Sequence, residues 1–231
     1  MIFCQLACLD SISILQYILG VEINMNYLPL FLNLQNKQIV IIGGGQVAER
    51  RLIRLLPFKE NITIVSPALD KSLRQLIELH NVYWLQTTCQ QEHFKKADLI
   101  VIATNDPITN QYVLENAPTS AWINAAHQAE AGNIHFPITI QKGKLQIAIS
   151  TGGASPILAK KLKKSLEAEL PDQYEQYIDF LFEARQLIKQ LNISVATRKQ
   201  LLHEIVEKPI YSKKDQQVWF EKLKKTNVMH D

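Results

Sequence analysis

The clearest pattern along this chain is a series of short apolar runs that alternate with amphipathic segments. The runs are rich in β-branched residues and end in small, polar or turn-forming residues, which is typical of buried strands. Between them, segments such as 69–79 carry apolar residues at helical spacing, and Pro107 is well placed to begin another helix. The runs predicted to be strands are 39–42, 62–66, 82–85, 98–105 and 122–126. Strands that alternate with helices predict a parallel sheet with helices on both faces, and therefore an α/β fold.

The pattern changes near residue 137. Two apolar runs, 136–140 and 145–150, lie so close in the sequence that they predict a hairpin rather than another crossover through a helix. Ser155 and Pro156 then suit the cap and the first residue of a helix predicted over 156–169. The rest of the chain is helical and rich in polar residues. We therefore predict a sheet domain, a small α+β connecting domain and a helical C-terminal domain, at 25–137, 138–171 and 172–231.

Residues 1–24 differ from the rest of the chain. They carry no Lys or Arg at their start, which argues against a secretory signal. Polar residues interrupt their apolar stretch too often for a membrane span. Met25 begins a segment that has the look of a natural amino terminus. We hypothesise that translation starts at Met25 and that residues 1–24 are an extension without a functional role.

The composition narrows the class of protein. Of the 231 residues, 47% are hydrophobic and 20% are charged, which is typical of an ordinary globular protein. The net charge is +3, and no segment interleaves basic and aromatic residues, so we do not predict nucleic-acid binding. The three cysteines match no zinc or disulfide spacing, and the histidines form no ligand spacing, so no metal site is predicted. A reducing cytoplasm is the simplest location.

The first candidate site follows the strand predicted at 39–42. Gly43, Gly44 and Gly45 separate this strand from an amphipathic segment that begins with Gln46 and Val47. Strand, tight turn and helix in this order open a dinucleotide-binding βαβ unit, in which the glycines let the backbone approach a diphosphate. The first amides of the helix and the positive end of its dipole then face the anion. Many apolar strands end in glycines for purely structural reasons, so the turn alone also allows that interpretation.

The end of the second predicted strand departs from the usual dinucleotide-binding pattern. An acid is expected there to bind the hydroxyls of the adenosine ribose, but this chain has Ser66, Pro67 and Ala68. These residues leave the choice between NAD and NADP open. Ser66 and the backbone at 67–68 could contact the ribose, or they could form only a structural turn.

Polar residues also follow the fourth and fifth predicted strands. Thr104, Asn105 and Asp106 follow the fourth strand, and Asn124 and His127 lie at the end of the fifth. Ligands of open α/β sheets bind outside the carboxyl ends of the strands, so these residues are candidates for contacts with a cofactor or substrate. Asn105 and Asp106 could equally cap the next helix. A neutral imidazole can accept a proton at physiological pH, although a lone histidine is more often structural.

A second pair of glycines precedes the long helix predicted after the hairpin. Gly152 and Gly153, flanked by Thr151 and Ser155, resemble a second anion-binding turn. Lys160 lies near other lysines at helical spacing on the helix that follows. Such a cluster would suit a substrate with many carboxylates, although a run of lysines is more often a solvated helix face.

Several segments together carry a family resemblance. They are 28–32, 42–50, 103–106 with Asn110, 148–160 and 170–171. In this combination the chain resembles the precorrin-2 dehydrogenase family of sirohaem synthesis, some of whose members are also sirohydrochlorin ferrochelatases. The most specific segment is Ser-Thr-Gly-Gly-Ala-Ser-Pro at 150–156, at its correct spacing behind the first glycine turn. The resemblance extends from about Met25 to Pro171 and continues more weakly beyond.

The resemblance implies a fold and an activity. The family oxidises precorrin-2, a partly reduced tetrapyrrole with many carboxylates, by passing a hydride to NAD, and the product is sirohydrochlorin. Its fold comprises a Rossmann domain, a small dimerisation domain and a helical domain, and the enzyme is a homodimer with the substrate cleft between domains. The family's NAD contacts correspond to Gln46, Val47, Pro67 and Ala68. The residues that we expect to contact the substrate are Asn124, Thr151, Gly152, Gly153, Ser155 and Lys160.

His127 is a departure from the family's pattern. The family usually has Asp at this position, after Asn and two small apolar residues, and that Asp handles protons in dehydrogenation and in metal insertion alike. His127 could accept the pyrrole proton as the hydride leaves. Metal insertion must also attract a cation, which suits a carboxylate better than an imidazole. We hypothesise that the enzyme only dehydrogenates and passes sirohydrochlorin to a separate chelatase.

The sequence also allows two other functions. A regulatory module could bind NAD(H) without turnover and contact a partner protein through its helical domain, but this would leave the second glycine turn and its lysines unexplained. A metal-inserting enzyme without redox activity would leave the first glycine turn without a purpose.

Overall fold

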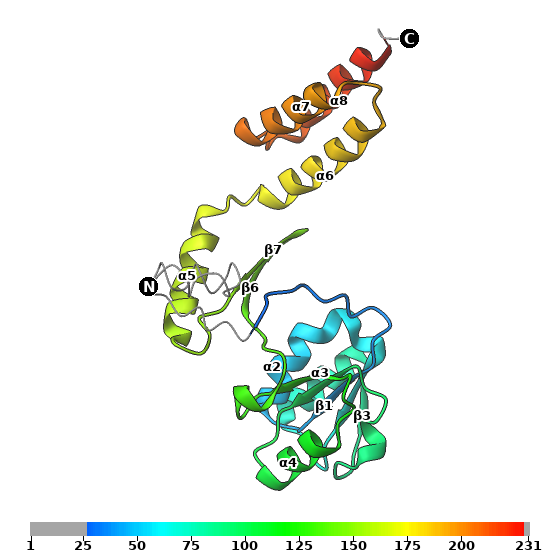
Figure 1. Cartoon of the computed structure of the whole chain (residues 1–231), viewed down its shortest axis with the longest axis vertical. Helices are drawn as coiled ribbons and strands as arrows, with labels where there is room; N and C mark the ends of the chain where they lie inside the picture. The colour runs from blue at the N-terminus through cyan, green and yellow to red at the C-terminus, as the bar shows by residue number, and fades with distance from the viewer. Residues whose placement is uncertain (1–26, 229–231) are drawn as a thin grey trace, which may run out of the picture. The chain divides into compact units, whose positions relative to one another are not determined.

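The computed structural model describes residues 27–228 and contains the alternating strands and helices that the sequence pattern predicts (Figure 1). Residues 1–24, which we interpret as an extension, lie outside the described residues. The chain divides into two compact units at the boundary between His135 and Phe136. The division of the chain into three domains stays a prediction.

The first unit is built on a five-stranded parallel sheet with the order β3-β2-β1-β4-β5. Its strands are β1 (Ile39–Ile42), β2 (Ile62–Val65), β3 (Tyr83–Leu85), β4 (Leu99–Ile102) and β5 (Trp122–Ala125). After β1 the chain adds β2 and β3 on one side of this central strand, and it then adds β4 and β5 on the other side. This reversal is the point at which open α/β sheets of the Rossmann type bind dinucleotides.

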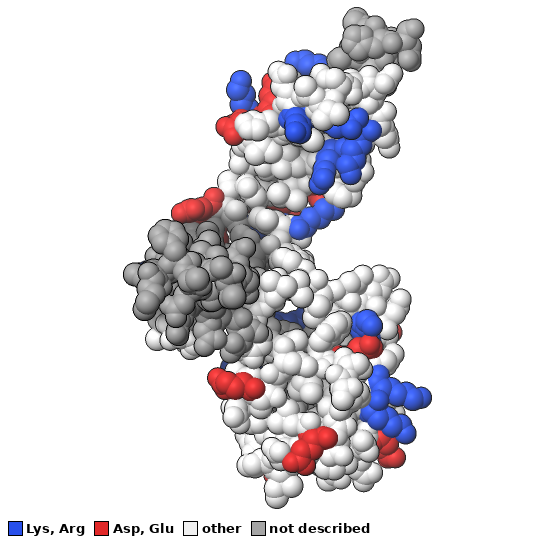
Figure 2. Space-filling view, viewed as in Figure 1, with Lys and Arg blue, Asp and Glu red and all other residues white. Residues whose placement is uncertain are grey.

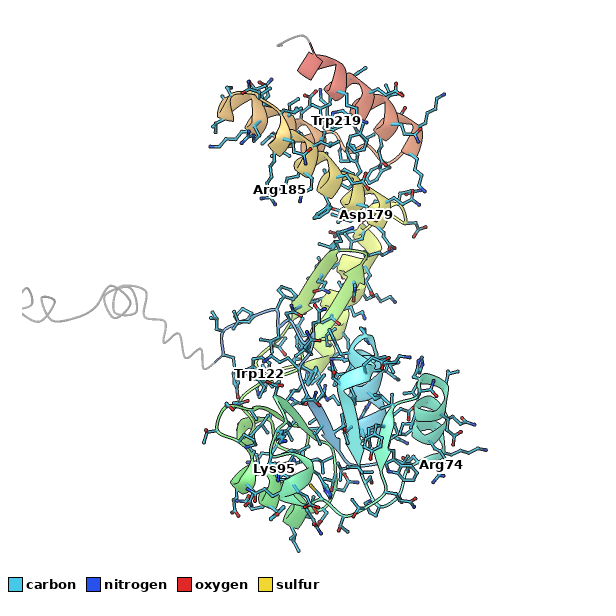
Figure 3. All side chains as sticks on the ribbon, turned by 90° about the vertical axis from the view of Figure 1, so that its right-hand side faces the viewer. Arg74, Lys95, Trp122, Asp179, Arg185 and Trp219 are labelled. Atoms are coloured by element: carbon cyan, nitrogen blue, oxygen red, sulfur yellow. The ribbon has the colours of Figure 1, made fainter. Side chains whose placement is uncertain are left out.

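Helices cover both faces of this sheet, as predicted. They are α2 (Gln46–Leu55), α3 (Lys71–His80) and α4 (Pro107–Asn116), with the 3₁₀ helices η2 (Leu56–Asn61), η3 (Gln91–His93) and η4 (Ala129–Ala131). In Figure 3, α3 and α4 lie on opposite sides of the strands. Every residue of β1 and β4 is buried, because these central strands have helices on both sides. Each buried Ile, Leu or Val side chain contributes roughly 1.5–3 kcal/mol to folding.

β4 begins one residue later and ends three residues earlier than the predicted strand at 98–105, and Asp98 lies just before it. Its carboxylate accepts a hydrogen bond from the Gln38 amide at 2.9 Å and pairs with Lys37 at 3.0 Å. These two interactions, the amide hydrogen bond first, lower the pKa of Asp98. Asp98 therefore fastens the chain just before β4 to the chain just before β1. After Ile102 the backbone leaves the sheet, so residues 103–106 are a loop at its carboxyl edge.

The second unit begins with the predicted hairpin and continues as helices. The strands β6 (Ile138–Lys142) and β7 (Leu145–Ile149) pair antiparallel through a two-residue turn. The turn uses Gly143 at φ +56°, where a side chain would also meet the Glu175 side chain at 2.7 Å. Lys144 forms an ion pair with Asp179 on α6, so the tip of the hairpin contacts that helix. The helices are α5 (Pro156–Glu169), α6 (Tyr174–Gln190), α7 (Val195–Glu207) and α8 (Lys213–Val228).

Aromatic residues form the core of the last three helices. Tyr177 and Phe180 on α6 are buried, and the Tyr177 hydroxyl donates to the Ile205 carbonyl on α7 at 2.7 Å. Phe180 packs edge-to-face on Trp219 of α8, which lies inside this group of helices (Figure 3). Burial raises the pKa of Tyr177. These contacts explain why three polar-rich helices stay together.

The surface of the described residues is mixed in charge. On the face drawn in Figure 2, Lys and Arg side chains lie in separate small groups with Asp and Glu among them. None of the helices within residues 27–228 is both long enough and apolar enough to span a bilayer.

Candidate active site

The first glycine turn joins the carboxyl ends of three strands. Gly43 has φ +127°, and a Cβ on it would lie 2.3 Å from the Ala103 carbonyl oxygen, just after β4. A Cβ on Gly44 would lie 1.9 Å from the Ala68 carbonyl oxygen and 2.6 Å from Ser66 Oγ, both after β2. Only glycine fits at these two positions. The turn therefore brings the predicted segments 66–68 and 103–104 together at one edge of the sheet.

Gly45 differs from the other two glycines. Its φ of −101° is open to any residue, and a Cβ on it would only be in ordinary contact with Asp70 Oδ2 at 3.7 Å. Gly45 is also the N-cap of α2, and because it has no side chain it forms no side-chain capping hydrogen bond. The first amides of α2, at Gln46 and Val47, thus keep their donors and the positive end of the helix dipole available. A small residue beside unused amides fits the diphosphate of NAD, as the sequence predicts.

Ser66 is held by its own loop. It is 7% exposed, and its hydroxyl donates to the Ala68 carbonyl at 2.7 Å. Its carbonyl accepts from the Trp84 indole nitrogen at 3.0 Å. Pro67 and Ala68 are exposed beside it. The structural turn that we considered for this segment is therefore present, and the predicted contacts with the ribose stay predictions.

Asp106 caps the helix α4, which confirms that interpretation of its position. Its carboxylate accepts from the amides of Ile108 at 3.3 Å and Thr109 at 3.1 Å, and from the Thr109 hydroxyl. These hydrogen bonds, the hydroxyl's first, lower the pKa of Asp106. The Thr104 hydroxyl accepts from the Asp106 amide at 2.7 Å, and this hydrogen bond holds residues 104–106 in a turn. Asn105 is exposed, and cofactor contacts from 104–106 stay a prediction.

Asn124 is buried and holds the segment that follows β5. It is 4% exposed, and its amide nitrogen donates to the Ile134 carbonyl at 3.1 Å. Asn133, which sequence reasoning missed, accepts from the Ile123 amide at 2.6 Å and donates to the Ala121 carbonyl at 2.9 Å. The chain thus returns along the free edge of β5. Asn124 has a structural partner here, and its contact with a substrate stays a prediction.

His127 lies in the loop between β5 and this returning segment. It is exposed and two residues beyond the carboxyl end of β5. Its place after β5 is the sequence signal that points to it, and among the described residues no hydrogen bond orients its ring. An exposed imidazole at the ligand edge of the sheet is free to meet a substrate. Its catalytic role stays a prediction.

The second glycine turn belongs to the other unit and has a different construction. Gly152 and Gly153 have φ of +58° and +86°, and a Cβ on either would have no neighbour within 4 Å. Ser155 caps α5 as predicted, because its hydroxyl accepts from the Leu158 amide at 3.1 Å. Thr151 Oγ1 accepts from the Ser155 amide at 3.2 Å. Both hydroxyls therefore have partners within the turn.

Lys160 is exposed on α5, one turn beyond the cap. The nearby Lys163 pairs with Glu167 at 3.6 Å, so part of the lysine cluster has a local partner. Contacts from Thr151, Gly152, Gly153, Ser155 and Lys160 to a substrate stay predictions. 

Asp70 lies beside the first glycine turn, a position that sequence reasoning missed. The sequence predicts a helix from residue 69, which would place Asp70 inside its first turn. In the structure α3 begins at Lys71, so Asp70 is the residue before the helix. Its amide donates to the Gly44 carbonyl at 2.8 Å, which brings its carboxylate to the glycine turn. An Asp at the boundary of a loop and a helix was the available signal.

Three family models match consecutive parts of the chain. An NAD(P)-binding model matches residues 30–138, a model of the central part of sirohaem biosynthesis proteins matches 142–169, and a SirC C-terminal domain model matches 174–219. The first contains every strand of the parallel sheet.

Curated relatives and a solved structure agree with these models. The chain is 33% identical to a precorrin-2 dehydrogenase of Priestia megaterium, over 77% of this chain and 88% of that protein. It is 30% identical to a precorrin-2 dehydrogenase of Bacillus subtilis, over 68% of this chain and 98% of that protein. A siroheme synthase of Aeromonas salmonicida is 33% identical, but the match covers only 39% of that longer protein.

The solved structure of SirC, a precorrin-2 dehydrogenase, matches with a TM-score of 0.75 and 30% identity, over 86% of this chain and all of that chain. Sequence and fold thus agree over most of the length of both proteins. The chain belongs to the precorrin-2 dehydrogenase family of sirohaem synthesis.

Proposed function

We infer that this chain is an NAD-dependent precorrin-2 dehydrogenase, which oxidises precorrin-2 to sirohydrochlorin in sirohaem synthesis. The observation that carries this inference is the combination of precorrin-2 dehydrogenase relatives with a glycine turn that leaves the start of α2 uncapped. NAD is the cofactor. A nucleotide-sensing module without turnover is not favoured, because the matched relatives are enzymes.

The protein's part in the reaction is to bind, orient and accept a proton. NAD supplies the hydride acceptor when bound, so the difficult chemistry belongs to the cofactor. The amides of Gln46 and Val47 hold the diphosphate, and the loops after β2 and β4 flank the bound nucleotide. His127 accepts the proton that the macrocycle releases as hydride leaves. The substrate is contacted by Asn124, Thr151, Gly152, Gly153, Ser155 and Lys160.

Turnover is the direct test of this function. Purified protein is mixed with precorrin-2 and NAD without oxygen, and the appearance of NADH is followed by absorbance. The expected result is NADH formation in step with sirohydrochlorin formation. Binding of NAD without any NADH would contradict the proposed activity and favour the sensing module.

The role of His127 is tested by substitution. His127→Asn removes the proton acceptor and is expected to lower kcat about 100-fold, because general acid–base groups contribute roughly that much or more. His127→Asp, which restores the residue usual in the family, is expected to keep most of the activity. Glu130→Gln, at an exposed acid in the same loop, serves as the control. Equal kcat for His127→Asn and the control would show that His127 is not the proton acceptor.

A narrower activity follows from the chemistry of the same residue. The chain dehydrogenates without inserting iron and passes sirohydrochlorin to a separate chelatase, because a neutral imidazole attracts a ferrous ion less than a carboxylate does. The protein is incubated with sirohydrochlorin and ferrous iron, and sirohaem formation is compared with a metal-only control. Formation above that background would overturn this part of the proposal.

The chain also assembles as a homodimer through its second unit. Three apolar side chains on α5 stay exposed in the described chain, namely Ile157 at 81%, Leu158 at 48% and Leu162 at 42%. Contiguous exposed apolar side chains of this kind mark interaction surfaces. Sedimentation of the protein is expected to give a dimer, and Ile157→Lys is expected to shift it toward monomer. A monomeric wild-type protein would exclude this assembly.

A reducing cytoplasm is the location that we propose, on the strength of a chain with three cysteines and no disulfide spacing. We also propose that residues 138–171 and 172–231 act as separate connecting and helical domains.

A further inference from the structure

Two aspartates occupy matching positions at the carboxyl edge of the sheet and behave differently. Asp106 follows β4 and is the N-cap of α4, and its carboxylate accepts from two amides of that helix. Asp70 follows β2 and is the N-cap of α3, but its side chain makes no capping hydrogen bond. Asp is among the best N-cap residues, and it normally uses its carboxylate on the helix that it begins. The carboxylate of Asp70 is therefore available for another partner.

The backbone directs Asp70 toward the first glycine turn. Its amide donates to the Gly44 carbonyl at 2.8 Å, and its Oδ2 atom lies 3.7 Å from the position of a Cβ on Gly45. The hydroxyl of Ser72, two residues on, donates to Glu49 of α2 at 2.6 Å. These two links hold the start of α3 against the start of α2. The exposed carboxylate of Asp70 is thus fixed beside the expected path of the dinucleotide.

This location matches a requirement that the sequence leaves unmet. Dinucleotide-binding folds use an acid near the end of the second strand to bind the ribose hydroxyls of NAD. The usual position here is Ser66, whose hydroxyl is already engaged with the Ala68 carbonyl. Asp70 is four residues later, but the loop returns it to the same edge of the sheet.

We propose that Asp70 binds the adenosine ribose of NAD and makes this enzyme prefer NAD to NADP. The proposal rests on the proposed function, because it names the residue that selects NAD as the cofactor of that reaction. A carboxylate accepts hydrogen bonds from the 2′-hydroxyl of NAD, and it repels the 2′-phosphate of NADP. The cation of Arg74, on the first turn of α3 (Figure 3), lies over the Trp84 ring of β3, 5.0 Å from its centroid. Lys71 and Arg74 are the basic residues at the start of this helix. Without the carboxylate of Asp70, their positive charges would attract the 2′-phosphate and so favour NADP.

The test measures binding and does not depend on turnover. Calorimetry gives the dissociation constants of NAD, 2′-deoxy-NAD and NADP for wild type and for Asp70→Asn, which keeps an equally good N-cap. Wild type is expected to bind NAD about tenfold more tightly than 2′-deoxy-NAD, since a hydrogen bond to a charged group has roughly that effect. In Asp70→Asn this difference is expected to shrink below about twofold, and the ratio of NADP to NAD affinity is expected to rise about tenfold. Glu78→Gln removes an exposed acid from the same helix and is expected to behave as wild type.

The outcomes separate this proposal from the function on which it rests. If wild type binds NAD, and Asp70→Asn keeps both the 2′-hydroxyl preference and the NADP ratio of wild type, Asp70 is not the ribose ligand and this proposal fails alone. An equal loss of affinity in Glu78→Gln would show a general charge effect and would also overturn it. If wild type binds neither NAD nor NADP, the proposed function itself fails.

Discussion

The two glycine turns of this chain look alike in sequence and are built differently. At the first turn, side chains on Gly43 and Gly44 would collide with backbone carbonyls of the neighbouring loops, and the helix that follows has no cap. At the second turn, Gly152 and Gly153 have open space around them, and Ser155 caps the helix. Glycines before a helix therefore serve two different purposes. At the first turn they let the ends of three strands pack closely and leave the first helix amides without a cap, whereas at the second turn they only let the backbone change direction.

The largest effect is expected from adding a methyl group at the packed turn. Gly44→Ala places a Cβ 1.9 Å from the Ala68 carbonyl oxygen and is expected to destabilise the protein by about 2–3 kcal/mol, as overpacking does. Gly153→Ala, at φ +86° in open space, is expected to cost only about 1–2 kcal/mol, from backbone strain. Urea unfolding of both variants measures the difference. Equal losses would contradict the distinction between the two turns.

The next effect separates ligand binding from folding at the first turn. Gly45→Ser introduces a side chain with room on the protein side and with an N-cap preference, so stability is expected to change by less than about 0.5 kcal/mol. The same side chain occupies the approach of the diphosphate, and NAD affinity is expected to fall at least about tenfold. Calorimetry with NAD and urea unfolding are both needed. Unchanged NAD affinity would show that the diphosphate does not lie against Gly45.

A smaller effect is expected from removing the cap at the second turn. Ser155→Ala deletes the acceptor for the Leu158 amide and is expected to destabilise α5 by about 1 kcal/mol. NAD affinity is expected to stay unchanged, because the proposed diphosphate contacts come from the first glycine turn and the start of α2. Ser155→Asp, which restores an acceptor, is expected to recover the stability. A loss of NAD binding in Ser155→Ala would show that the second turn also contributes to NAD binding.

The smallest expected effect is that of Asp106 on the stability of the protein at low pH. Hydrogen bonds lower the pKa of Asp106 in the folded protein. Its contribution to stability is therefore present above the ordinary pKa of an aspartate, and it is lost as the pH falls through the lowered value. Asp106→Asn is expected to make the free energy of unfolding less dependent on pH below the ordinary pKa of an aspartate, as urea titrations would show. An unchanged pH dependence would mean that the cap has no influence on acid stability.

The sequence was most informative where strands are buried and continuous. The apolar runs at β1 and β4 predicted the parallel sheet, and Pro156 after Ser155 predicted the start of α5, because these signals are local. Asp70 was missed because its position beside the glycine turn depends on where a loop returns, which a helix pattern from residue 69 obscures. Asn133 was missed for a similar reason. Its partners, Ile123 and Ala121, are brought to it only by the folded loop.

The contacts of Asn133 also have a consequence for the behaviour of the protein in solution. β5 is the last strand of its sheet, and an open strand edge invites pairing with another chain. Here the side chain and backbone of Asn133 occupy the hydrogen-bonding groups of Ile123 that a foreign strand would need. The segment that begins at Asn133 thereby shields this edge of the sheet from pairing with another chain, and the same loop contains His127.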